Sequence, residues 1–555
     1  MSPEFAYQLA LTHRQAGRFA ESEALLRQIV AAQPANANAW HQLAAILLTT
    51  GRPGEAAGYL ARAIAASPDQ PHFYSDQGVA CALLGRNEEA VISYQRALSL
   101  EPRAAPTHRN LGDILFAMGR NEEAIASYRR ALALAPNEAA AHNNLGNVFL
   151  QQGCLIEAGD CYERAAQLDP RLLVAHSNLG DVLTKLGRPE AGLVCAQRVL
   201  ALDPNFPDGY LNMGVACWLM SRFPEAEACY RRAIALRADF VSAHVNLGLL
   251  LLLLGRHAEG WREYEWHWRS KMPADRHGES GATLWDGKPA PGKSILTYAD
   301  QGVGDTIHFL RYLPLLAERS GAARIVVACQ SAVLPLLEQW RSERFEFVAQ
   351  EDGPEPLTAH DLQLPLLSLP LVLDHPEPLP MATPYLQADE RRRAVLRARL
   401  NRSASLLVGL AWSGNPTQGD NRRRSVPPEA LLPILRVPGV SFVNLQVTPR
   451  GPLPPALATS GVLDITADLS DFADTAALLA ELDLIITVDT GTAHVAGALG
   501  RPTWVMLARV PYWLWGLDGE NTPLYPNLRL FRQTRAADWE GVVERVAGAL
   551  HSFKG

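Results

Sequence analysis

Three short segments in the C-terminal half carry residues suited to chemistry, and each follows a predicted strand. Gln301-Gly-Val-Gly-Asp305 comes directly after the apolar run SILTYA, so a glycine turn places the carboxylate of Asp305 at the start of a helix. A positioned carboxylate can accept the proton of a hydroxyl group while that oxygen forms a new bond. His308 lies one helical turn further on and is an alternative base, or else a packing or acceptor-binding residue.

The other two segments are suited to binding an anion. The run DTGTAH at 489–494 follows the apolar run LDLIITV and opens an Ala-rich helix, whose N–H groups and positive end attract a diphosphate. The loop 412–427 contains three consecutive arginines, which are either phosphate ligands or an ordinary solvated surface. The residues expected to bind a ligand that carries such a diphosphate are Ser413, Arg423, Arg424, Gln446, Asp489, Thr490, Gly491, Thr492 and His494.

The elements that must position these residues alternate between strands and helices. From residue 293 onward, short β-branched or leucine-rich runs such as RIVVAC, LLVGLAW and VSFVNLQ are separated by helical stretches. This alternation predicts parallel sheets, which bind ligands at the carboxyl ends of their strands. We expect a first lobe at 293–388 and a second lobe at 389–555, facing each other across a cleft. The aromatic run PYWLWG at 511–516 either lines this cleft or packs inside the second lobe.

The N-terminal half repeats with a period of 34 residues, which is the period of tetratricopeptide (TPR) repeats. Proline cannot continue a helix and marks the ends of the units, while small residues let paired helices approach closely. Stacked helical hairpins bury a continuous core and present a concave inner face. The sequence therefore predicts an α-solenoid, a TPR superhelix, over residues 1–271. Its units are expected to begin near Pro3, Ala37, Pro71, Ala105, Ala139, Leu173, Pro207 and Val241.

One position of the predicted inner face carries asparagine in successive repeats. A carboxamide offers both a donor and an acceptor, so a ladder of them can pair with the backbone of an extended peptide. The alternative is that these side chains bond only within the scaffold. The ladder resembles that of O-GlcNAc transferase, and the residues expected to bind an acceptor are Asn110, Asn144, Asn178, Asn212 and Asn246.

The repeat pattern ends in the aromatic segment GWREYEWHWRSK at 260–271. We expect this segment to cap the solenoid or to dock it on the next domain, the alternative being a site that stacks sugars. Residues 272–292 are rich in Pro, Gly and charge and are expected to form the linker between the domains.

The segment from about 295 to 535 resembles the ADP-heptose:lipopolysaccharide heptosyltransferases, a glycosyltransferase family, through GVGDTI, GLAWSGNP, DFADTAAL and DTGTAHVAGALGRP. The resemblance implies a GT-B fold of two Rossmann-like lobes, inversion at the sugar and no catalytic metal. It also implies that Asp305 is the base and that Arg424, where the family has lysine, meets the donor phosphates. The resemblance further assigns the diphosphate cradle to Asp489, Thr490, Gly491 and His494.

Together these features predict an inverting, metal-independent glycosyltransferase that moves a sugar from a nucleotide-sugar donor to a protein acceptor held by the TPR groove. Flagellin or another surface protein is a client by analogy only. The alternatives are a lipopolysaccharide or other glycan acceptor, and a scaffold with an inactive transferase domain.

The bulk composition narrows the class of partner. The chain has 51 Lys and Arg against 58 Asp and Glu, a net charge of −7, so no global basic field favours a nucleic-acid partner. The seven cysteines stand singly, without zinc-ligand spacing. The most apolar run, Leu249 to Leu254, is far short of the roughly 20 residues that span a bilayer. We therefore expect a cytoplasmic protein that has no transmembrane segment or export signal, and the family resemblance implies that it needs no cofactor.

Overall fold

The computed structural model describes residues 2–269, 283–350, 360–379, 384–400, 406–416, 421–447 and 451–553. The chain divides into two compact units, Met1–Pro204 and Asn205–Gly555, and this division falls inside the predicted repeat array. Most of the predicted linker, 272–282, lies outside the described residues, as do 270–271 of the aromatic segment. Within the described ranges no helix is both long and apolar enough to cross a membrane.

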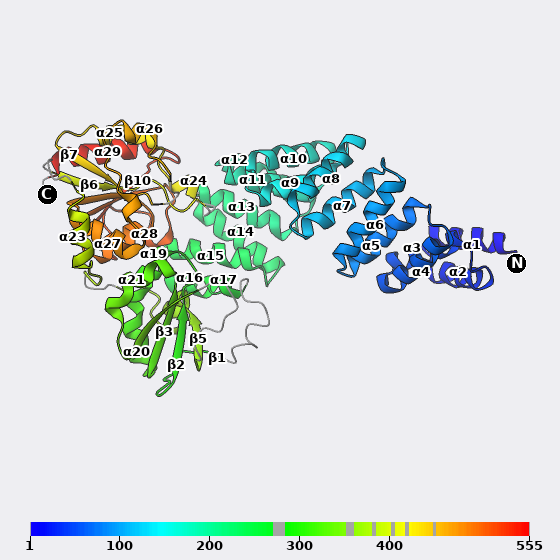
Figure 1. Cartoon of the computed structure of the whole chain (residues 1–555), viewed down its shortest axis with the longest axis horizontal. Helices are drawn as coiled ribbons and strands as arrows, with labels where there is room; N and C mark the ends of the chain where they lie inside the picture. The colour runs from blue at the N-terminus through cyan, green and yellow to red at the C-terminus, as the bar shows by residue number, and fades with distance from the viewer. Residues whose placement is uncertain are drawn as a thin grey trace. The chain divides into compact units, whose positions relative to one another are not determined.

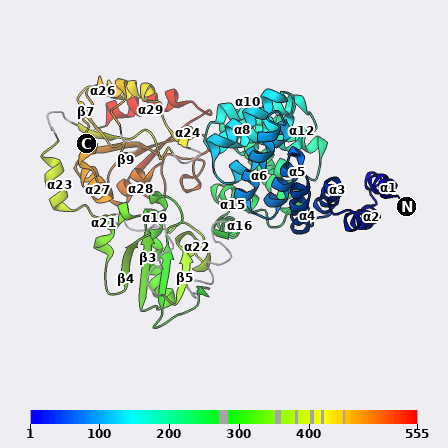
Figure 2. The same cartoon turned by 45° about the vertical axis from the view of Figure 1, so that its right-hand side comes forward.

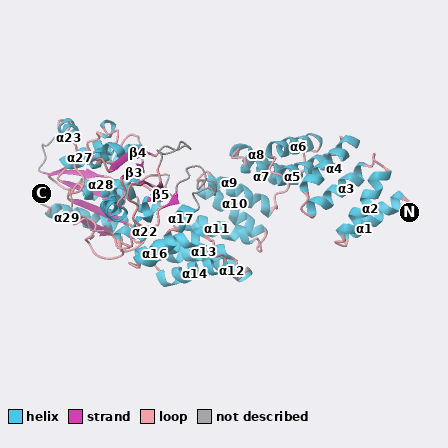
Figure 3. Ribbon diagram, turned by 90° about the horizontal axis from the view of Figure 1, so that it is seen from below, coloured by secondary structure: helices cyan, strands magenta, loops and turns pink. Residues whose placement is uncertain are grey.

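The first unit is a stack of helical hairpins, and the strands of the chain all lie further along it (Figure 3). The first helices of its hairpins begin at the predicted residues, from Pro3 to Leu173. Between paired helices the chain turns at glycines such as Gly17, whose φ of 73° lies in the left-handed region, where glycine carries no steric penalty. The helices are α1 (Pro3–Gln15), α2 (Phe19–Ala32), α3 (Ala37–Thr49), α4 (Pro53–Ala66), α5 (Pro71–Leu83), α6 (Asn87–Leu100), α7 (Ala105–Ala117), α8 (Asn121–Leu134), α9 (Ala139–Gln151), α10 (Leu155–Leu168), α11 (Leu173–Lys185) and α12 (Pro189–Leu202).

A close contact inside several hairpins explains a second series of glycines. A Cβ atom at Gly78 would lie 2.5 Å from the ring of Tyr94, which is buried. Gly112 meets Tyr128 in the same way. Only glycine lets the two helices of such a hairpin approach around a buried tyrosine ring, so the two residue types occur together, at a fixed spacing, in the hairpins that have this contact.

The second unit begins with further repeat helices and continues into the two lobes. Trp261, which is 2% exposed, packs edge-on against Trp513 with ring centroids 5.1 Å apart and donates a hydrogen bond to the carbonyl of Pro376 at 2.9 Å. The aromatic segment thus docks the last repeat on the lobes, which is one of the two roles predicted for it. The helices of this part are α13 (Pro207–Leu219), α14 (Phe223–Leu236), α15 (Val241–Leu253), α16 (His257–Tyr264) and α17 (Trp266–Arg269).

The first lobe is built on a parallel sheet in the order β1-β5-β2-β3-β4 (Figure 1). Its central strands are buried because helices pack on the sheet, as expected for βαβ units. The strands are β1 (Thr283–Leu284), β2 (Ser294–Tyr298), β3 (Arg324–Cys329), β4 (Phe345–Ala349) and β5 (Leu362–Pro365). The helices are α19 (Val303–Phe309), α20 (Leu313–Ser320), α21 (Leu334–Leu337) and α22 (Leu369–Val372).

The second lobe holds another parallel sheet, in the order β10-β9-β8-β6-β7. Helices α23 and α27 lie side by side (Figures 1 and 2), where Arg393 and Arg397 pair with the buried Glu481. The predicted α-solenoid followed by a two-lobed α/β fold is therefore confirmed. The strands are β6 (Leu406–Leu410), β7 (Val440–Asn444), β8 (Leu484–Val488), β9 (Thr503–Leu507) and β10 (Leu528–Arg532). The helices are α23 (Glu390–Arg397), α24 (Asn421–Arg424), α25 (Leu432–Leu435), α26 (Pro455–Ala458), α27 (Phe472–Glu481), α28 (Gly491–Ala498) and α29 (Trp539–Ser552).

Candidate active site

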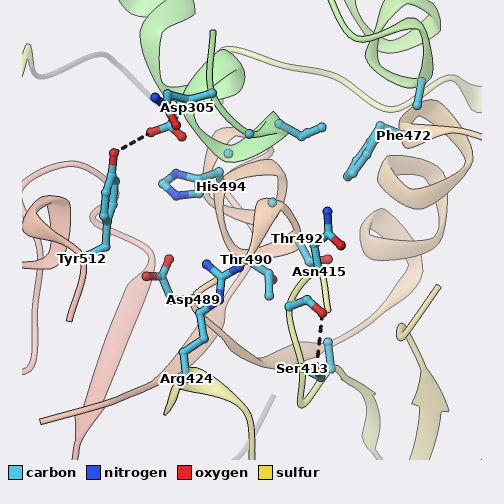
Figure 4. Close-up of a pocket in the computed structure, with 18 of the residues that line it drawn as sticks. Asp305, Ser413, Asn415, Arg424, Phe472, Asp489, Thr490, Thr492, His494 and Tyr512 are labelled. Carbon is cyan, nitrogen blue, oxygen red and sulfur yellow. Dashed lines mark hydrogen bonds between the residues drawn. The ribbon is translucent and has the colours of Figure 1, made fainter. Parts of the chain in front are cut away.

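A cavity of about 1050 Å³ lies in the second unit, between the two lobes and the last repeat. The segments that line it follow β2, β6, β7 and β8, so it lies at the carboxyl ends of strands from both sheets, where parallel sheets bind ligands. Figure 4 shows that side chains from these segments converge on one space. The residues predicted for the site that line it are Asp305, Ser413, Arg424, Gln446, Asp489, Thr490, Gly491, Thr492, His494 and Asn246.

Asp305 stands in the first turn of α19, directly after the glycine turn that ends β2. Burial raises the pKa of its carboxyl to about 7, and the negative charges of Asp300 and Asp489 act in the same direction. Tyr512 donates a hydrogen bond to the Oδ1 atom of Asp305 at 3.2 Å, which opposes the shift (Figure 4). A carboxylate with a pKa near neutrality is well matched to accept a proton at physiological pH.

His494 lies on α28 in the second lobe and lines the cavity. A Cβ atom at Gly304 would lie 2.7 Å from the His494 ring, so the glycine of the turn allows α19 and α28 to touch. The Nδ1 atom of His494 is 3.2 Å from the hydroxyl of Tyr525. Burial and the nearby Arg311 guanidinium lower the pKa of His494 to about 3, so the ring is neutral at physiological pH.

His308 does not line the cavity, so its position fits the packing role that the sequence also allowed and not that of an alternative base. Its side chain is fully buried, packed near Phe309, His494 and Trp513, and it is not among the residues that line the cavity. Neither ring nitrogen has a hydrogen-bond partner among the described residues. Residues three apart on a helix lie only about 60° apart around its axis, so Asp305 and His308 are neighbours on one side of α19, and of the two only Asp305 lines the cavity. Burial holds the pKa of His308 well below its usual value.

The arginine run divides into residues with different surroundings. Arg424 lines the cavity beside the turn that follows β8 (Figure 4), whereas Arg423 is exposed and does not line it. A Cβ atom at Gly414 would lie 2.7 Å from the Arg424 guanidinium, so this glycine lets the charged group lie against the loop backbone. Residues 417–420 of the loop lie outside the described residues. The geometry favours Arg424 over Arg423 as a phosphate ligand.

Ser413 and Gln446 line the cavity, but their side chains also hold the loops together. The Gln446 Oε1 atom accepts hydrogen bonds from the backbone N–H groups of Trp412 and Ser413, at 3.2 and 2.9 Å. The Ser413 hydroxyl lies 2.9 Å from that of Ser425. These bonds fix the ends of β6 and β7, so both residues shape the walls in addition to any contact with a ligand.

The turn after β8 leaves the start of α28 open to the cavity. Thr490 is the N-cap residue and makes no side-chain capping bond; its hydroxyl lies instead 3.2 Å from that of Thr487 and 3.3 Å from the carbonyl of Val488. The first N–H groups of the helix are therefore not capped by Thr490, and Thr490, Gly491 and Thr492 all line the cavity. Such a helix end attracts anionic groups.

Several lining residues were not predicted as site residues. Tyr512 lines the cavity while Trp513, Leu514 and Trp515 beside it are buried, so the run 511–516 both lines the cleft and packs the lobe. Tyr264 and His267 come from the aromatic docking segment. A density of aromatic residues was their only signal, and it did not distinguish lining from packing.

The asparagine ladder is not uniform. Asn144 and Asn178 lie in the first unit and donate hydrogen bonds to other inner-face side chains, and the carboxamide oxygen of Asn110 accepts one from Arg109 at 3.0 Å. In the second unit Asn246 lines the cavity, while Asn212 does not. The alternative that the ladder side chains bond within the repeat scaffold therefore applies to Asn144 and Asn178.

Among the described residues, no group of three or more His, Cys, Asp and Glu side chains is placed to hold a metal ion. The expectation of a metal-independent site stays a prediction.

The chain is similar to known proteins in both of its parts. A model of "Glycosyltransferase family 9 (heptosyltransferase)" matches residues 466–507, which contain β8, α28 and β9. Tetratricopeptide-repeat models match residues 7–71, 43–108, 112–153, 139–172 and 218–264. Protein FlbA of Caulobacter vibrioides is 29% identical over 321 residues, which are 53% of this chain and 52% of FlbA, so the chain spans about half the length of that curated relative.

Solved structures are also similar. The TPR protein YrrB, described as having an unusual peptide-binding site, is 22% identical, with 33% of this chain and 95% of YrrB covered at a TM-score of 0.30. PilF of Pseudomonas aeruginosa is 20% identical, with 37% of this chain and 94% of PilF covered at a TM-score of 0.35. The sequence matches identify TPR repeats in the N-terminal part, and the segment that carries Asp489 and His494 indicates a glycosyltransferase.

Proposed function

We propose that the protein transfers a sugar from a nucleotide-sugar donor to a hydroxyl group of a polypeptide, with inversion and without a metal ion. The observation that carries this proposal is the convergence of Asp305, Arg424 and the uncapped start of α28 on one cavity. The family 9 match to the second lobe and the TPR matches support the two halves of the proposal.

The reaction is a single displacement. The acceptor oxygen attacks C1 of the donor sugar, its proton passes to Asp305, and the bond between C1 and the diphosphate oxygen breaks with its electron pair. One displacement inverts the configuration at C1. The leaving nucleoside diphosphate gains charge, which Arg424 and the N–H groups of residues 491 and 492 stabilise without a metal.

The cavity also has room for two substrates. Its volume of about 1050 Å³ lies just above the range of ordinary small-molecule pockets, which measure roughly 300–1,000 Å³. The nucleotide is expected against the second lobe near Gln446, and the acceptor on the side of Asp305. Asp305 and Asp489 come from different lobes, so donor and acceptor meet between them.

The function is tested by replacing the base. The purified protein is given a panel of nucleotide sugars, and release of nucleoside diphosphate is measured together with the intact mass of co-expressed candidate acceptors. Asp305→Asn is expected to lower transfer by about 10²- to 10⁴-fold while it still binds the nucleoside diphosphate. Turnover retained in Asp305→Asn and lost in His308→Ala would assign the base to His308 instead.

The acceptor class is tested in the same experiment. Mass added to a glycan and to no protein would favour a heptosyltransferase-like activity, in line with the printed description of family 9. No turnover with any donor in the panel or in cell extract would favour a scaffold with an inactive domain.

A further inference from the structure

One wall of the active-site cavity is built by α15, the first helix of the last repeat. Five residues of this helix line the cavity, and they recur at the spacing of one helix face. They are Val241, Ser242, Val245, Asn246 and Leu249. The inner face of the repeat therefore continues into the cavity that holds Asp305. Asn246 is the only residue of α15 with a side-chain amide.

Two of the corresponding asparagines of the first unit, Asn144 and Asn178, are engaged by the preceding repeat, whereas the carboxamide oxygen of Asn110 accepts a hydrogen bond from Arg109 of its own repeat. The Nδ2 group of Asn144 donates to the Oδ1 atom of Asp113 at 2.8 Å, across 31 sequence positions. The Nδ2 group of Asn178 donates to Asn147 at 3.2 Å, again across 31 positions, and to Asn143 at 3.1 Å across 35 positions. These bonds tie neighbouring hairpins together.

Asn246 lacks both of these acceptors. The residue 31 positions before it is Val215, and the residue 35 positions before it is Leu211. Neither side chain can accept a hydrogen bond. The Asn246 side chain, which is partly exposed, makes no hydrogen bond to another described residue. Its donor and its acceptor are therefore both available to a ligand in the cavity.

We propose that Asn246 binds the main chain of an extended acceptor peptide and so presents a Ser or Thr hydroxyl to Asp305; this inference rests on the proposed function. A carboxamide can pair with one peptide N–H and one carbonyl at the same time. The neighbouring Val241, Val245 and Leu249 contact apolar side chains well but offer no hydrogen bond to sugar hydroxyls. The α15 wall thus fits a peptide better than a glycan.

The test uses the full chain and short synthetic peptides, each with one central Ser or Thr flanked by Ala, Val or Leu. The donor is the nucleotide sugar that the wild-type protein turns over. Asn246→Ala is expected to raise the KM for the peptide by about 5- to 100-fold, since two hydrogen bonds of ordinary strength are lost, with a smaller effect on kcat.

A second variant tests the same point without removing the asparagine. Val215→Asp restores the acceptor that Asp113 provides to Asn144, and it is expected to engage Asn246 and raise the KM in the same direction. Val215→Ala is the matched control, because it changes the same position without adding an acceptor, and its KM is expected to stay within about twofold of the wild-type value.

Main-chain recognition is tested with peptides in which one amide N–H beside the Ser or Thr is replaced by an ester oxygen. At the position that Asn246 contacts, the ester is expected to raise the KM of the wild-type protein and to have no further effect in Asn246→Ala. A merely structural role of Asn246 would leave the two effects additive at every position.

The outcomes separate the inference from the proposed function. If the wild-type protein modifies peptides and both Asn246→Ala and Val215→Asp keep its KM, the inference is wrong and the function stands. If Asn246→Ala raises the KM for the nucleotide sugar alone, Asn246 contacts the donor and the inference is wrong. If the wild-type protein modifies glycans and none of the peptides, the polypeptide acceptor itself is wrong, and the inference falls with it.

Discussion

Asp305 is held between opposing influences on its charge. Burial and the carboxylates of Asp300 and Asp489 disfavour its ionised form, while the hydroxyl of Tyr512 stabilises it. With a pKa of about 7, a large fraction of Asp305 is ionised at neutral pH and can accept a proton. Tyr512 is therefore expected to set the pH range in which the site works.

Tyr512→Phe is expected to shift the pH profile of kcat/KM. In the wild-type protein, kcat/KM should rise with pH and level off above about pH 7, because the base must be deprotonated. Loss of a hydrogen bond worth about 0.5–1.5 kcal/mol raises the pKa of Asp305 by up to about one unit, so the rise moves to higher pH. The variant should be impaired at about pH 6 and recover at about pH 9. A rise that stays in place or moves to lower pH would separate Tyr512 from the titration of Asp305.

Arg424 and Arg423 provide a matched pair for the donor phosphates. Arg424 lines the cavity and Arg423 does not. Arg424→Ala is expected to weaken binding of the nucleoside diphosphate and to lower turnover, each by about ten- to a hundredfold, because the same charge meets the donor and the leaving group. Calorimetry with the nucleoside diphosphate measures the first effect, and Arg423→Ala should stay near the wild-type value. Equal losses in the two variants would instead point to a general effect of loop charge.

The placement of individual residues was predictable where the chain itself specifies it. Asp305 and the 489–494 turn follow apolar strands directly, so the end of each strand carries them to the cavity. Tyr264 and Tyr512 reach the same cavity only because distant segments pack together, and no local pattern reveals that. The orientation of His308 depended on which side of α19 faces the core, which one short helix does not indicate.

At the scale of elements, the repeats were the most predictable part of the chain. Proline and glycine recur at the ends of the hairpins, and the helices begin at the residues that this spacing predicts. The first lobe is less regular than the repeats. The helical stretch that begins near Asp305 is divided into α19, a 3-10 turn at Leu310–Tyr312 and α20. Pro314 near the start of α20 has no N–H group to continue the α-helical hydrogen bonding, which accounts for the break.

The ladder asparagines of the first unit are expected to contribute to stability. Asn144 and Asn178 bond to side chains of the preceding repeat. Replacing both with Ala removes their three donated bonds, each worth about 0.5–1.5 kcal/mol, so the free energy of unfolding of the first unit should fall by about 1.5–4.5 kcal/mol. Urea unfolding followed by circular dichroism measures this loss, and the KM for short peptides should change little. A raised KM without any loss of stability would indicate that Asn144 and Asn178 bind the acceptor instead of stabilising the repeats.

At the scale of the whole molecule, the active-site cavity lies entirely within the second unit. Its walls come from the two lobes and from α15 with the docking segment that follows it. Trp261 and Tyr264 share a buried core with residues of both lobes, so the last repeat is part of the catalytic body. The first unit has separate cores of its own. Under the proposed function, the second unit would carry out the chemistry, and the first unit is proposed to bind the part of a long acceptor that lies outside the cavity.

Deleting residues 1–204 is therefore expected to leave a folded protein that still turns over the donor. Because the cavity and Asn246 remain, the KM for short peptides should stay within about threefold of the full-length value, while the KM for a long protein acceptor should rise by about tenfold or more, since contacts along the repeats are lost. Circular dichroism and the cooperativity of thermal unfolding check that the exposed face of α13 has not destabilised the remaining chain. A folded truncated protein that modifies long and short acceptors with unchanged KM values would exclude the first unit from acceptor binding and leave it as a docking platform for another partner.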